Sequence, residues 1–254
     1  MVFFIIRILP LLIPVLYFLI SKGLFYYSDQ WYWLLLAVVA GNCFYFLLLK
    51  SKPAGKKIIS LLIYSTIYIV VGFVFLLLLE NSIIINLYLL AWSLVYFLLL
   101  EAIFHWYFAT PKSTLLNLSE IIGYLNLILI FFLTAALIYF YIFLTLEIYW
   151  LLLIFFGCVG FILWQLFSAY QFKTSISLSY IAIITILLTE ALLALLLLPV
   201  SFYVISSTVA VFYFWLTAYA LAYLRHNLNR KVGWQYFIFG IIILAVILAT
   251  AAWF

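Results

Sequence analysis

The sequence predicts an all-α protein, a polytopic integral membrane helical bundle of about nine transmembrane helices. Of its 254 residues, 72% are hydrophobic and 7% are charged, whereas a soluble domain is about half apolar and about a quarter charged. The mean hydropathy is +1.43. The apolar runs, such as residues 121–146, are continuous and do not alternate with polar residues. Long continuous runs favour membrane helices over the strands of a membrane barrel.

Nine segments match or exceed the minimum of about 17 residues that a membrane helix needs. They form a single transmembrane domain over residues 1–254 and cover residues 3–20, 31–49, 58–79, 83–108, 119–145, 148–170, 177–198, 202–224 and 235–253. The first is a retained span that Pro10 and Pro14 kink or delay, because no small-residue cleavage site follows it. The fourth and fifth are longer, so we expect them to tilt. The apolar stretch from 178 to 224 is too long for one helix and divides at Pro199 and Ser201.

The connecting loops divide by charge. Alternate loops hold nearly all of the basic residues: Lys50, Lys52, Lys56, Lys57, Lys112, Lys173, Arg225, Arg230 and Lys231. The opposite loops hold Lys22 with Asp29, Glu80 and Glu147. The positive-inside rule then places the N-terminus in the cytoplasm and the C-terminus outside. Compact loops and the absence of targeting features favour a bacterial inner (plasma) membrane.

Familiar catalytic signatures are absent from the sequence. It has no phosphate-binding or dinucleotide-binding glycine motif, no zinc-protease motif and no nucleophile elbow. With two histidines and two isolated cysteines, it predicts neither a metal site nor a cofactor, and it argues against an enzyme. The net charge of +5 is explained by the orientation of the chain in the membrane. We therefore expect contacts with membrane lipids and no binding of nucleic acid. A protein partner in the membrane is compatible with the sequence.

Glu190 is the most informative polar residue. It lies about thirteen residues into the seventh predicted span, close to the membrane midplane. A carboxylate there is costly and usually faces the interior of the bundle. Such a residue is a proton or cation site, an anchor for a polar ligand, or a protonated carboxyl that bonds a neighbouring helix and only helps assembly.

Glu101 and His105 form a second candidate. They are four residues apart on the fourth span, so they share one helix face near its cytoplasmic end. A carboxylate beside an imidazole is suited to proton transfer. The structural alternative is an ion pair at the membrane interface that caps the helix end.

Several polar residues lie at one depth from the predicted cytoplasmic side. The layer consists of Asn42, Tyr64, Ser65, Glu101, Asn126 and Gln165. If they face inward they line a polar cavity open to the cytoplasm, with Glu190 deeper; otherwise each is an ordinary interhelical hydrogen bond.

Three function classes follow from these residues. The first is a protein that binds or transports a small or lipidic substrate through a cytoplasm-facing polar cavity. The second is a membrane-embedded subunit or assembly factor. The third is an intramembrane enzyme on a lipid-linked substrate, which the sparse polar residues disfavour. The sequence favours the first.

Overall fold

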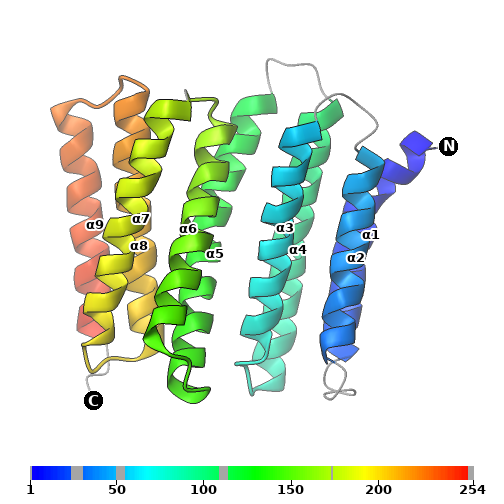
Figure 1. Ribbon diagram of the computed structural model, residues 1–254, viewed down its shortest axis with the longest axis horizontal. Coiled ribbons are helices and arrows are strands. Elements are labelled where there is room, and N and C mark those ends of the chain that lie inside the picture. The colour runs from blue at the N-terminus through cyan, green and yellow to red at the C-terminus, as the bar shows by residue number, and fades with distance from the viewer. Residues whose placement is uncertain (1, 24–30, 50–54, 109–113, 173, 251–254) are drawn as a thin grey trace. The chain divides into compact units, whose positions relative to one another are not determined.

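The protein is all-helical in the part of the chain that the computed structural model describes, residues 2–23, 31–49, 55–108, 114–172 and 174–250. Its nine helices confirm the predicted fold class (Figure 1). They are α1 (Val2–Gly23), α2 (Trp31–Leu49), α3 (Gly55–Leu76), α4 (Ser82–Phe108), α5 (Thr114–Phe143), α6 (Ile148–Ala169), α7 (Thr174–Leu196), α8 (Phe202–Leu224) and α9 (Arg230–Thr250).

Six of these helices are long and apolar enough to cross a membrane, namely α3 to α8. The chain is therefore an integral membrane protein. The apolar stretches described in α2 and α9 are shorter, at 35–49 and 233–247, and α1 contains Pro10 and Pro14. It stays a prediction that these three helices also cross the membrane. The cytoplasmic side of the basic loops is likewise a prediction. Several residues behind the predicted orientation lie outside the described residues: Lys50, Lys52, Lys112, Lys173 and Asp29.

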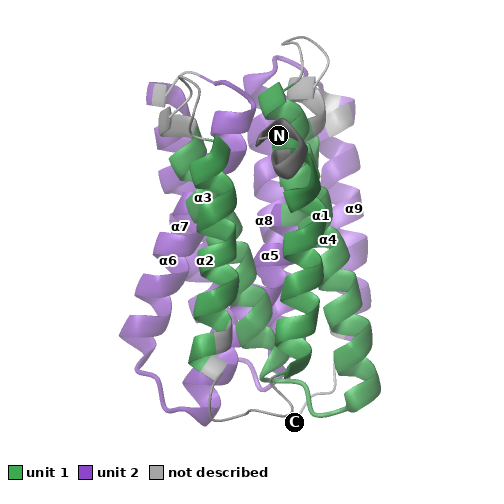
Figure 2. Cartoon of the chain, turned by 90° about the vertical axis from the view of Figure 1, so that its right-hand side faces the viewer, with its two compact units in different colours: residues 1–125 green, residues 126–254 purple. Residues whose placement is uncertain are grey.

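The chain forms two compact units, residues 1–125 and 126–254, and the boundary falls within α5 (Figure 2). In the first unit, α1 packs against α2 and α4, and α3 packs against the same two helices. In the second unit, α6, α7, α8 and α9 pack as successive neighbours. The single domain expected from the sequence stays a prediction.

A column of buried aromatic rings fills the first unit between α3 and α4. Tyr68 stacks on Trp92 with ring centroids 4.3 Å apart. Tyr88 also stacks on Trp92, with ring centroids 5.6 Å apart. The Tyr88 hydroxyl donates a hydrogen bond to the Gly72 carbonyl at 2.9 Å. Gly72 has no side chain where the Trp92 indole lies, so the two helices approach closely.

Candidate functional site

A buried hydrogen-bond network joins three helices of the first unit. The amide nitrogen of Asn42 on α2 donates to the hydroxyls of Ser65, at 2.9 Å, and Thr66, at 3.1 Å, both on α3. The amide oxygen of Asn42 accepts from the Tyr96 hydroxyl of α4 at 2.8 Å. Asn42, Ser65 and Tyr96 are almost completely buried. These groups satisfy one another, so the network holds helices together without needing a ligand.

Three further residues of the predicted polar layer are also buried. Tyr64 lies in the first unit, and Asn126 and Gln165 lie in the second. The Asn126 amide donates to the Ile162 carbonyl of α6 at 3.4 Å. The two surface pockets described below are not lined by any of these three residues. Apart from Glu101, the polar layer thus consists of buried groups in both units, and the cavity that it is expected to line stays a prediction.

Glu101 is part of a three-residue cluster that the sequence revealed only in part. Its carboxylate oxygen Oε1 lies 2.8 Å from Nη1 of Arg7 on α1 and 3.1 Å from Nε2 of His105 on the same helix, α4. The Arg7 guanidinium also lies over the Phe104 ring, 4.8 Å from its centroid. The carboxyl side chain is 22% exposed, whereas Arg7 and His105 are 47% and 56% exposed. One half-buried carboxylate therefore holds two exposed nitrogen-bearing side chains side by side.

An apolar groove of about 320 Å³ lies between α1 and α4. It is lined by Leu11, Pro14, Val15, Phe18, Leu90, Ser93, Leu94 and Phe97. Leu11 lies one turn after Arg7, and Phe97 lies one turn before Glu101, so cluster and groove share one face of the two helices. The Ser93 hydroxyl donates to the Leu90 carbonyl of its own helix at 3.0 Å, which leaves the groove wall apolar.

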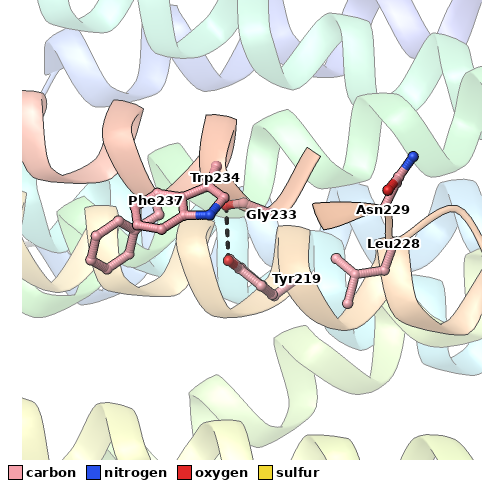
Figure 3. A pocket seen from close by; sticks show the side chains of 6 residues that line it. All are labelled: Tyr219, Leu228, Asn229, Gly233, Trp234 and Phe237. Atoms are coloured by element: carbon pink, nitrogen blue, oxygen red, sulfur yellow. Dashed lines mark hydrogen bonds between the residues drawn. The ribbon is translucent and has the colours of Figure 1, made fainter. Parts of the chain in front are cut away.

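A second pocket, of about 460 Å³, lies between α8 and α9 in the second unit (Figure 3). Its lining consists of Tyr219, Leu228, Asn229, Gly233, Trp234 and Phe237. The Tyr219 hydroxyl points to Gly233 and donates to its carbonyl at 2.8 Å. The added methyl group of an alanine at this glycine would lie 3.2 Å from that hydroxyl oxygen. The pocket is therefore built around a tyrosine whose polar group is already bonded.

Glu190 lies on the exposed surface of α7, which contradicts its expected place in the bundle interior. Burial along α7 explains this position, because Thr185, Leu188 and Leu192 form the packed face of the helix. Glu190 follows Ile186 and Ile183 on the opposite, exposed face. Of the described residues, none forms a hydrogen bond or an ion pair with its carboxylate.

The described residues contain no group of three or more histidines, cysteines, aspartates or glutamates that could hold a metal ion. Cys43 and Cys158 are both free. No protein-family model, curated protein or solved structure matches the chain. Any functional interpretation therefore depends on the geometry of these sites.

Proposed function

We propose that this protein binds a lipidic substrate that carries a phosphate headgroup, at the α1–α4 face of the first unit. One observation carries the proposal: Arg7 and Glu101 of the cluster each lie one helix turn from the lining of an apolar groove, on the same face of the same two helices. A polar end and an apolar groove match the two parts of an amphiphile.

The cluster supplies donors suited to a phosphate. Glu101 occupies one nitrogen of the Arg7 guanidinium, which has five N–H donors in all. The guanidinium and the His105 imidazole are both about half exposed, so their remaining nitrogens can reach a bound anion. A planar guanidinium binds phosphate oxygens in pairs. Glu101 serves here as a positioning residue, because its one oxygen bonds both side chains.

The groove supplies a surface for an acyl chain. Together with the cluster, from Arg7 to Phe18, it spans eleven residues of α1, or ~16 Å at ~1.5 Å per residue. This length is about half of the ~30 Å hydrocarbon core, which is the thickness of one leaflet. Leu11 and Leu90 are more than half exposed, so a chain can lie along the groove from the bilayer. The buried members of the polar layer, Asn42, Tyr64, Ser65, Asn126 and Gln165, take no part in this binding.

Binding of matched lipids to the detergent-purified protein tests the proposal, with native mass spectrometry as the readout. The probes are lysophosphatidic acid, the monoacylglycerol with the same chain, and inorganic phosphate. We expect lysophosphatidic acid to bind at least about tenfold more tightly than monoacylglycerol, the equivalent of ~1.4 kcal/mol, and inorganic phosphate not to bind. Equal affinity for the two lipids would overturn the headgroup site.

Substitutions in the cluster and in the groove separate the two parts of the site. Arg7→Gln should lower the affinity for lysophosphatidic acid about tenfold and leave monoacylglycerol unchanged, because it removes a charged donor. Leu94→Trp should lower the affinity for both lipids, because the larger ring fills the groove. Arg225→Gln is the control, since that guanidinium lies over Tyr170 in the second unit. If Arg7→Gln does not fold, Arg7→Lys keeps the charge and should still bind several-fold more weakly.

A further inference from the structure

Glu190 presents a carboxylate to the membrane from the outer surface of α7. It lies eleven residues after Ser179 and nine before Pro199, in a stretch whose other polar residues are Thr185 and Thr189. The Thr189 hydroxyl donates to the Thr185 carbonyl of its own helix at 2.8 Å, and so does not serve the carboxylate. Of the described residues, none therefore donates a hydrogen bond to the Glu190 carboxylate.

The neighbours of Glu190 on this face are large and apolar. Ile183, Ile186, Leu187 and Leu193 are each more than 40% exposed. Together with Glu190 they form a surface at the three- and four-residue spacing of one helix face, here called the α7 face. Lipid tails offer no hydrogen bond to a carboxylate, so ionisable groups within membranes pair with one another or with polar backbone. The α7 face is thus complementary to a partner that brings a positive charge.

A second copy of this chain does not bring that charge. Every lysine and arginine of the described residues lies in a loop or within two turns of a helix end. A copy in the same membrane orientation, related by a two-fold axis at α7, places a second Glu190 against the first. Two like charges at close range repel.

We infer that the α7 face docks a transmembrane helix of another protein, one that carries a lysine or arginine at the depth of Glu190. The ion pair compensates both charges inside the hydrocarbon, and the flanking isoleucine and leucine side chains pack around it. This inference is independent of the lipid site, because it concerns a different helix in the other unit. It supports a role as a membrane-embedded subunit alongside lipid binding.

Energy transfer in lipid vesicles tests the inference with synthetic helices as probes. The donor-labelled protein is mixed with acceptor-labelled leucine–alanine transmembrane peptides that have Lys, Leu or Glu at the central position. We expect the Lys peptide to associate about tenfold more tightly than the Leu peptide. Glu190→Gln should remove most of this difference, and Glu190→Lys should transfer the preference to the Glu peptide. Glu120→Gln, at an exposed glutamate of α5, is the matched control and should change nothing.

The same vesicles test whether a second copy of this chain, and not a helix of another protein, occupies the α7 face. Equal association of the Lys and Leu peptides would overturn the inference, and so would self-association of the protein that depends on Glu190. If Glu190→Lys fails to fold, the comparison of wild type with Glu190→Gln still decides the result. A native partner supports the inference only if its membrane helix holds a Lys or Arg whose replacement by Leu abolishes association.

Discussion

At the scale of single residues, Gly72 leaves less space for a side chain than any other glycine whose surroundings the structure describes. A methyl group added there would lie 1.9 Å from Nε1 of Trp92, and the Trp92 ring stacks with both Tyr68 and Tyr88. We expect Gly72→Ala to destabilise the protein by ~1–3 kcal/mol, because α3 and α4 must separate to relieve the overlap.

The matched control is Gly41→Ala on α2 of the same unit. A methyl group at Gly41 meets nothing within 4 Å. That substitution should be neutral or stabilise the helix by ~0.5–1 kcal/mol, the usual gain for alanine in a helix. Thermal unfolding of both variants in the same detergent measures the difference. Equal unfolding temperatures would show that the α3–α4 contact does not have this geometry.

The sequence predicted the depth of polar residues along their helices better than the direction in which their side chains face. Counting from the predicted helix ends placed Asn42 and Ser65 in one layer, and the two do bond each other. The same counting expected Glu190 to face inward, whereas α7 turns it outward. The helix is apolar nearly all the way round, so no amphipathic pattern reveals which face is packed. Arg7 was missed as the partner of Glu101, because 94 residues separate the two in the chain.

At the scale of helices, the ends of α6 and α8 depend on residues other than glycine. Gln171 and His226 follow these helices with φ of 57° each. The His226 N–H donates to the Tyr223 carbonyl, and the next N–H, of Asn227, donates to the Ala222 carbonyl. This pattern closes a helix and favours glycine at the residue with positive φ. The sequence therefore offered no glycine signal at either helix end.

His226→Gly should stabilise the end of α8. An L-residue in this conformation costs ~1 kcal/mol relative to glycine, so we expect a gain of about that size. His226 is exposed, and the replacement removes no buried contact. Asn227→Gly is the control, because Asn227 does not have positive φ. Unfolding temperatures compare the two variants; a loss of stability in His226→Gly would contradict the geometry of this turn.

Helix bounds were predicted closely where hydropathy changes abruptly. The predicted bounds of α2 and α8 are those of the structure. The predicted starts of α3 and α5, at 58 and 119, lie three and five residues after the observed starts at Gly55 and Thr114. Polar and basic residues can continue a helix beyond the hydrocarbon core of the membrane, because the backbone hydrogen bonds form within the helix itself. Hydropathy detects only the apolar part.

At the scale of the whole molecule, the number of crossings decides which side each loop faces. The α3–α4 loop carries Glu80, and the α8–α9 loop carries Arg225. If every helix from α4 to α8 crosses, these two loops lie on opposite sides, because five crossings separate them. The positive-inside rule then assigns the α8–α9 loop to the cytoplasm.

Cysteine labelling in intact cells tests this arrangement. In a chain without Cys43 and Cys158, Asn81→Cys should react with a membrane-impermeant maleimide added outside, because Asn81 is exposed in the loop that precedes α4. Asn227→Cys, exposed after α8, should react only once the membrane is permeabilised. Labelling of both from one side would show that one helix between them does not cross. Reversed labelling would keep the five crossings and overturn the predicted orientation, because the basic loops would then face outward.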